Sequence, residues 1–149
     1  AQALVVSKFD EEQAVVSPDG RWLAYVSNET GADEVYVRPF PNTQDAKWAV
    51  TTSGGSEPVW SHSGTELFYR SGQRQMMAAK VRTKPTFAVV LSTVLFSDRP
   101  FVTNRYYAEY DVAPNDQRFI MIRPVSTTTT GALIVVMNLV GQLKRLAPK

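Results

Sequence analysis

EPVWSHSGTELFYR, residues 57–70, has two counterparts elsewhere in the chain. Residues 15–26 read VVSPDGRWLAYV, and residues 111–122 read DVAPNDQRFIMI. Each copy joins two apolar runs through a four-residue turn rich in Ser, Pro, Asp, Asn or Gly, residues that favour tight turns. The three copies therefore predict three β-hairpins, and their spacing sets the organisation of the chain.

Further short runs with the composition of β-strands follow each hairpin. Four strands in a repeat of roughly 40 to 45 residues are typical of a β-propeller blade. The sequence therefore predicts an all-β fold of three four-stranded antiparallel blades, half of a six-bladed β-propeller in a single domain. The expected blades cover residues 13–52, 57–96 and 106–137, and the first strand of the third blade is expected over 106–112.

The two ends of the repeat array look complementary. Residues 4–6, Leu-Val-Val, read as an outer strand without a partner in their own repeat, whereas the third repeat lacks an outer strand. Open sheet edges promote aggregation, so proteins pair or cover them. We therefore expect a homodimer that closes a six-bladed ring about a two-fold axis, each copy lending residues 4–6 to the last blade of the other. The alternative is that the chain is an excised half of a longer propeller.

Past the last repeat, Leu139, Leu143 and Leu146 recur at spacings of four and three. This spacing predicts a short amphipathic C-terminal helix, which would cover the last blade.

Composition excludes several classes of function. With 16 basic and 14 acidic residues and no basic stripe, the sequence predicts no nucleic-acid partner. The chain has no cysteine, so it can form neither a disulfide nor a thiolate metal site. No apolar run approaches the roughly 20 residues that span a bilayer, so no membrane segment is expected.

SPDGRWLAYVS, residues 17–27, resembles the WD40-like (PD40) repeat of the TolB propeller family. The stretches EVYVRPFP (34–41), GGSEPVWS (54–61) and ELFYR (66–70) are similar to the C-terminal propeller modules of bacterial serine/threonine kinases. The resemblance implies a bacterial propeller and slightly favours the periplasm over the cytoplasm. It implies no kinase activity, because the chain contains no Gly-rich phosphate loop, His-Arg-Asp loop or Asp-Phe-Gly stretch.

The second and third turns depart from the family pattern. His62 and Ser63 replace its Pro-Asp pair in the second copy, and the third copy carries Ala113, Asn115 and Asp116. These changes leave the turn intact, but they argue against a ligand role common to the turn positions.

His62 is the single histidine, so any serine-histidine relay would have to use it. Its neighbours Ser61 and Ser63 are in the same turn, and adjacent turn residues rarely point at each other as a nucleophile and a base must. We therefore expect a turn residue and no catalytic group. No metal or cofactor is expected either, because calcium-loop spacing is missing among the acidic candidates Asp19, Asp33, Glu34, Asp111 and Asp116.

Aromatic residues on the predicted strands, among them Trp22, Trp48 and Trp60, are best explained by packing between blades. The candidates for a ligand-binding surface are Arg105, Tyr106 and Tyr107, in the long connection before the third hairpin.

The leading functional hypothesis is a non-enzymatic sensor or interaction module that binds a protein or peptide at the rim or central channel. The alternative is a hydrolase or lyase with its site in that channel. Convergent ionisable groups with shifted pKa values would favour the enzyme. A third alternative is an isolated fragment without an independent function.

Overall fold

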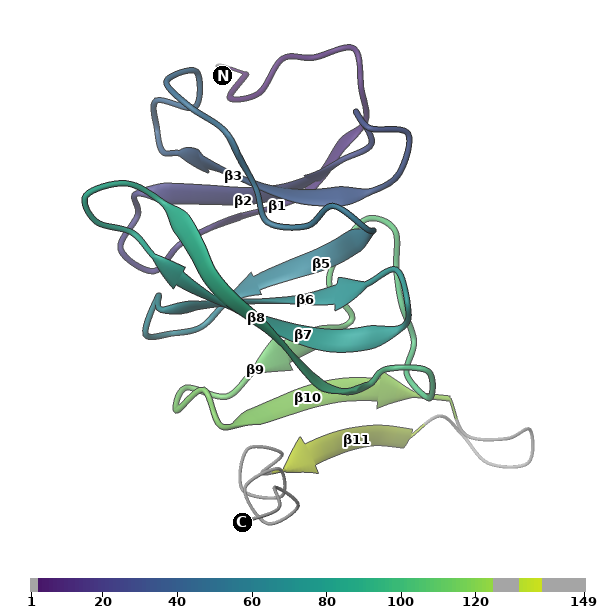
Figure 1. Cartoon of the computed structure of the whole chain (residues 1–149). Helices are drawn as coiled ribbons and strands as arrows, with labels where there is room; N and C mark the ends of the chain where they lie inside the picture. The colour runs from purple at the N-terminus through teal and green to yellow at the C-terminus, as the bar shows by residue number, and fades with distance from the viewer. Residues whose placement is uncertain (1–2, 125–131, 138–149) are drawn as a thin grey trace.

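The structure is a computed structural model that describes residues 3–124 and 132–137. Three antiparallel sheets are stacked face to face, with the N-terminal segment above the first sheet and β11 at the opposite end (Figure 1). Strands follow one another in sequence order within each sheet. This meander, repeated three times, is the arrangement of β-propeller blades.

The first blade contains β1 (Glu11–Val16), β2 (Trp22–Ser27), β3 (Glu34–Pro39) and β4 (Trp48–Ala49). The second blade contains β5 (Gly55–Trp60), β6 (Glu66–Ser71), β7 (Gln75–Arg82) and β8 (Ala88–Ser97). The third blade contains β9 (Tyr110–Val112), β10 (Arg118–Arg123) and β11 (Ala132–Met137).

The all-β class and the blade architecture are confirmed, with three strands in the described part of the third blade. The expected C-terminal helix falls on residues 138–149 and lies outside the described residues. In the described ranges every regular element is a strand, so they hold no helix that could cross a membrane.

Two expected strands differ in the structure. The run predicted over 106–112 becomes a strand only at Tyr110, because the N–H of Tyr106 donates to Asn104 Oδ1 (2.8 Å) and keeps that segment in a turn. Residues 4–6 form no strand within the single chain; the carbonyl of Leu4 accepts a hydrogen bond from the Thr43 hydroxyl instead. The exchange of this segment between two copies stays a prediction.

The three hairpin turns share one hydrogen-bond pattern despite their different sequences. The fourth residue of each turn donates its N–H to the carbonyl of the first, over 2.9 Å in the first two turns and 2.8 Å in the third. That fourth residue has a positive φ of 70° at Gly20, 69° at Gly64 and 57° at Asp116. The third turn thus keeps the shape without glycine, at a position that Asp tolerates better than most residues.

The two apolar cores lie between the blades. One core combines Val26 and Val37 of the first blade with Leu67 and Tyr69 of the second. The other packs Phe68 of the second blade against Phe119 of the third, edge to face with ring centroids 5.0 Å apart. Blade stacking therefore supplies most of the buried apolar area.

Phe87, just before β8, is the hub of the first core. Its ring lies 5.5 Å from Trp22, 5.8 Å from Trp48 and 6.5 Å from Trp60, measured between centroids. The three tryptophans therefore serve inter-blade packing, around a phenylalanine that the repeat pattern did not single out.

Replacing Phe87 with Ala should lower the free energy of unfolding by about 3–5 kcal/mol, because a 1% exposed aromatic side chain leaves a cavity. Urea denaturation measures this loss. The matched control is Val90→Ala in β8, the strand that follows Phe87, where the side chain is 61% exposed and a change below about 0.5 kcal/mol is expected. Equal losses for the two variants would contradict the assignment of Phe87 as the hub.

Candidate functional site

The first strands of the blades meet along one side of the stack through two β-bulges. The register of β1 shifts between Glu12 and Val15, and that of β5 shifts between Ser56 and Val59. Gln13 and Glu57 occupy the bulges with φ values of 55° and 52°. A bulge leaves a backbone group outside the ladder. The side-chain oxygen of Gln13 accepts the N–H of Glu57 over 2.5 Å.

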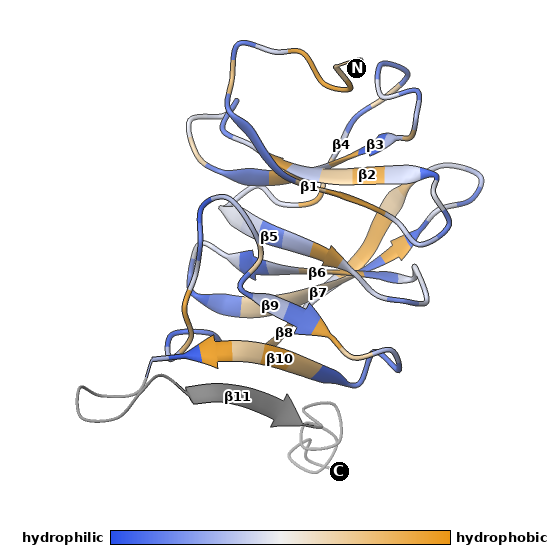
Figure 2. Cartoon of the chain, turned by 180° about the vertical axis from the view of Figure 1, so that it is seen from behind, coloured by the Kyte–Doolittle hydropathy of each residue, from blue (hydrophilic) through white to orange (hydrophobic). Residues whose placement is uncertain are grey.

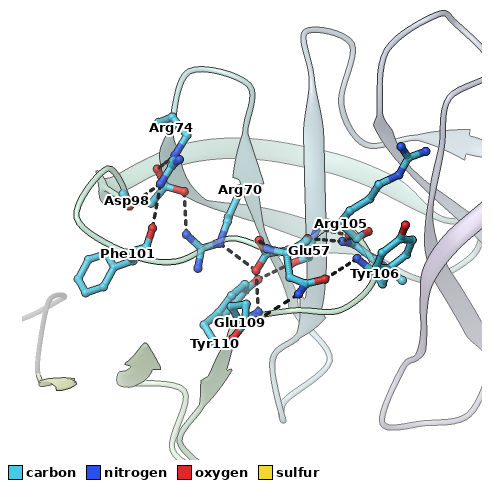
Figure 3. Close-up of polar contacts among 11 residues, drawn as sticks. Glu57, Arg70, Arg74, Asp98, Phe101, Arg105, Tyr106, Glu109 and Tyr110 are labelled. Atoms are coloured by element: carbon cyan, nitrogen blue, oxygen red, sulfur yellow. Dashed lines mark hydrogen bonds and ion pairs between the residues drawn. The ribbon is translucent and has the colours of Figure 1, made fainter. Parts of the chain in front are cut away.

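The side chain of Glu57 accepts backbone N–H groups of the segment that leads into the third blade, as the side chain of Gln13 does for the second. Its buried carboxylate accepts the N–H of Glu109 over 2.8 Å and the N–H of Asn104 over 3.2 Å. The Tyr110 hydroxyl donates to the Glu57 carbonyl over 2.7 Å. Figure 3 shows these contacts converging on Glu57 from the segment that leads into β9. One side chain therefore fastens the connection between the second and third blades.

Arg70 of β6 balances the buried charge of Glu57. Its Nε lies 3.0 Å from Glu57 Oε2, and its Nη1 donates to Asp98 Oδ2 over 2.8 Å. Arg74 contacts the other Asp98 oxygen over 2.9 Å. Because an isolated charge would be very costly at this depth, Glu57, Arg70 and Asp98 depend on one another.

Burial raises the pKa of Glu57, although Arg70 and the two N–H donors act in the opposite direction. Burial, followed by the nearby Glu57 charge, also holds the pKa of the Tyr110 hydroxyl well above its usual value. Tyr110 therefore stays protonated and remains a hydrogen-bond donor to the Glu57 carbonyl.

A pocket of about 380 Å³ opens beside this network. Six ionisable side chains, three cationic and three acidic, contribute to its wall: Asp33, Glu57, Arg70, Arg74, Asp98 and Arg105. Within the described part of the chain, Arg70 Nη2 and Ser71 Oγ are buried in this wall without a hydrogen-bond partner. The pocket thus combines paired charges with two unused hydrogen-bonding groups.

Arg105, a candidate from the sequence, does line the pocket. Its guanidinium reaches back to the first blade, with Nε 3.2 Å from Glu12 and Nη2 3.1 Å from Asp10. Tyr106 and Tyr107, 69% and 58% exposed, lie next to it in sequence but are not part of the pocket wall. The structure therefore separates the three sequence candidates into one pocket residue and two surface residues.

Sequence reasoning missed Glu57, Arg70 and Asp98 as members of a site. The available signal was a pair of opposite charges, Glu57 and Arg70, at the two ends of the second hairpin motif. Asp98 follows β8 in a long connection and has no counterpart in the repeat, so the sequence held no comparable signal for it.

His62 lies between the turns of the second and third blades. Its N–H donates to Asp116 Oδ1 over 2.7 Å, and the N–H of Ser63 donates to Asp116 Oδ2 over 3.1 Å. The His62 ring also faces Asp116, with Nδ1 3.2 Å from Oδ1. Ser61 Oγ accepts the N–H of Glu66 instead (3.0 Å). The geometry joins two blades and contains no serine-histidine relay.

The acidic residues weighed as metal ligands are dispersed. Glu34 is held by the Thr51 hydroxyl and by the N–H of Gly54 (2.9 Å), whereas Asp19 accepts a bond from the Ser17 hydroxyl (2.6 Å). That bond lowers the pKa of Asp19. Among the residues that the structure describes, no three His, Cys, Asp or Glu side chains are grouped so as to hold a metal ion.

The stacked meanders define a partial β-propeller, and the pocket lies at one end of the strands of its second blade. The chain resembles the oligogalacturonate lyase of Vibrio parahaemolyticus, with a TM-score of 0.60 and 13% identity over 82% of this chain and 32% of that one. It also resembles a 6-phosphogluconolactonase homologue of Bacteroides uniformis, with a TM-score of 0.51 and 14% identity over 91% of this chain and 43% of that one. At such identities the likeness shows the fold alone.

TolB of Acinetobacter baumannii aligns with a TM-score of 0.42 and 12% identity, over 91% of this chain and 45% of that one. The chain thus spans between a third and a half of the length of these structures. No family model matches the sequence, and no curated protein matches it significantly.

Replacing Glu57 with Ala should reduce the free energy of unfolding by about 3–5 kcal/mol, since it leaves Arg70 buried without one of its partners. Thermal and urea unfolding would measure the loss. Glu12→Ala serves as the control, because Arg105 in its ion pair is exposed to solvent and the pair should contribute far less to stability. A Glu57→Ala protein as stable as the control would show that the buried network does not hold the blades together.

Replacing Asp116 with Asn should cost about 1 kcal/mol at neutral pH, because the N–H donors of His62 and Ser63 lower the pKa of Asp116 in the folded protein. A lowered folded-state pKa contributes stability above the unfolded value, near 3.8, that is lost as the pH falls through the folded value. Urea unfolding at a series of pH values should show the two proteins converging below that range. A constant difference at all pH values would contradict this origin.

Proposed function

We propose that the chain is a non-enzymatic propeller module that binds a protein or peptide segment in the pocket at one end of the strands of its second blade. The observation that carries the proposal is the state of the buried ionisable groups. Glu57 and Asp98 are both engaged by arginine side chains, and Glu57 also accepts two backbone N–H groups. These acids are positioned to hold the pocket together, whereas a general base needs a free lone pair directed at a substrate.

The groups that remain for a ligand are mainly donors. Arg70 Nη2 and Ser71 Oγ have no hydrogen-bond partner among the described residues, and the guanidinium groups of Arg74 and Arg105 are partly exposed at the pocket wall. Donors of this kind favour carboxylates and backbone carbonyls. An extended peptide segment with acidic side chains supplies both, so we assign the pocket to such a segment.

The rival function, a hydrolase or lyase in the channel, draws on the same pocket, but the two buried acids of the described wall, Glu57 and Asp98, are engaged by arginine side chains. The fold likeness to a lyase at 13% identity does not extend to chemistry. A sensor or scaffold requires only that the pocket discriminate between partners, which paired charges and fixed donors can do.

Fluorescence anisotropy with a labelled peptide of alternating Glu and Gly residues tests the proposal. This peptide should bind more tightly than its Gln and Gly counterpart, and more weakly as salt increases. Arg105→Gln should weaken binding about three- to tenfold, since it removes a charge at the pocket rim. Arg82→Gln, which removes the same charge from an exposed position at the opposite end of β7 from Arg74, should have no effect.

Ser71→Ala is a second variant for the peptide-binding measurement. It removes one of the two groups that have no hydrogen-bond partner among the described residues, and it leaves the charge of the pocket unchanged. Equal binding of the Glu and Gln peptides, or equal effects of the two arginine substitutions, would overturn the assignment of the pocket.

A further inference from the structure

The residue four positions before each hairpin turn lies in or just before the first strand of its blade, which we call the inner edge, and in the first two blades it makes the same kind of contact with the next blade. Gln13, Glu57 and Glu109 occupy this position in the first, second and third blades. The side chain of Gln13 accepts the N–H of Glu57, and that of Glu57 accepts the N–H of Glu109. Each blade therefore supplies a side-chain acceptor to the backbone of the next blade. We call this series the inner-edge ladder.

The inner-edge ladder is incomplete at both ends. The carboxylate of Glu109 is an acceptor for a following blade, and within the described part of the chain it accepts only one long hydrogen bond, from Asn104 Nδ2 (3.4 Å). At the other end, no side chain among the described residues accepts the N–H of Gln13. The third blade thus presents a side-chain acceptor, and the N–H of Gln13 in the first blade holds the position that receives such an acceptor in the second and third blades.

The faces of the terminal blades show the same incompleteness. Ile120 pairs across the third hairpin in the register that Ala24 and Phe68 have in the first and second, where both are buried against the next blade. Ile120 is nevertheless 40% exposed, and Ile122, two residues along the strand, is 41% exposed. Figure 2 shows the apolar colour of β10 near the end of the stack.

On the opposite face of the stack, one residue of the first blade is exposed where its counterparts in the other two blades are buried. Val16 has the register of Trp60 and Val112, which are buried against the preceding blade, but Val16 is exposed. Most of this face of the first blade is already closed within one chain, because Leu23 and Tyr25 are only 3% and 2% exposed, the Arg38 guanidinium lies over Tyr25 (5.8 Å) and Lys47 lies over Tyr36 (4.9 Å). An incoming blade therefore contacts the inner half of the first blade, beside Val16 and Gln13.

We propose that a second copy of this chain docks head to tail, with its first blade against the free face of the third blade. In that interface the Glu109 carboxylate accepts the N–H of the partner's Gln13, and Ile120 and Ile122 pack beside the partner's Val16. The interface continues the inner-edge ladder from one copy into the next. Two copies of three blades close a ring with two such interfaces, which leaves neither terminal blade unpaired.

Light scattering on the purified chain tests this directly. The wild type should have twice the 16.6 kDa mass of a single chain. Ile120→Asp should have the single mass, because it places a charge in the interface at a position already exposed in one chain. Val90→Asp introduces the same charge at an exposed valine of β8 and should keep the double mass.

Substitutions of Glu109 distinguish the contribution of the inner-edge ladder to dimerisation from the contribution of the apolar contacts. Glu109→Ala should weaken dimerisation about tenfold for each of the two interfaces, the effect of losing a hydrogen bond to a charged group. Glu109→Gln should retain most of the affinity, because Gln13 makes the same contact with an amide oxygen.

A single-chain mass for the wild type at every concentration would overturn the proposal and assign the free face to a further blade of a longer chain. A dimer that Ile120→Asp and Glu109→Ala leave unchanged would overturn it as well, since another surface would then join the copies. Circular dichroism confirms that each variant keeps its strands.

Discussion

The ion pair between Glu57 and Arg70 is the constraint on which the stack depends. A carboxylate at this depth is tolerable only with a cation and several donors around it. The donors come from Asn104 and Glu109, which belong to the connection into the third blade, while the cation comes from the second hairpin. Because the Glu57 carboxylate in the second blade needs these donors, it fixes the position of the segment that leads into the third blade.

The same constraint explains why the pocket has a fixed shape. Arg70 is held from both sides by Glu57 and Asp98, and Asp98 is held in turn by Arg74. A guanidinium with two carboxylate partners has little rotational freedom, so the groups left over point in fixed directions. A pre-organised set of donors can recognise a ligand with less loss of conformational entropy on binding.

The repeat determined how much could be predicted. Turn residues and strand alternation are local signals, so the all-β class and the blade architecture follow from sequence. The site does not, because Glu57 and Asn104 are far apart in sequence and meet only through the bulge in β5. Arg105 was a sequence candidate because it lies in an unusually long connection. The turn between Asn104 and Tyr106, which separates Arg105 in the pocket wall from Tyr106 and Tyr107 on the surface, could not be predicted from residue propensities.

The inner-edge ladder also bears on how the chain unfolds. A stack of locally folded repeats can lose its units one at a time when the contacts between neighbours are weak. Here the amide hydrogens of Glu57 and Glu109 are each held by the preceding blade, so neither can exchange with solvent until that blade moves away. These two hydrogens are built-in reporters of separation at the first and second blade junctions, and comparing their exchange rates would show which junction opens first.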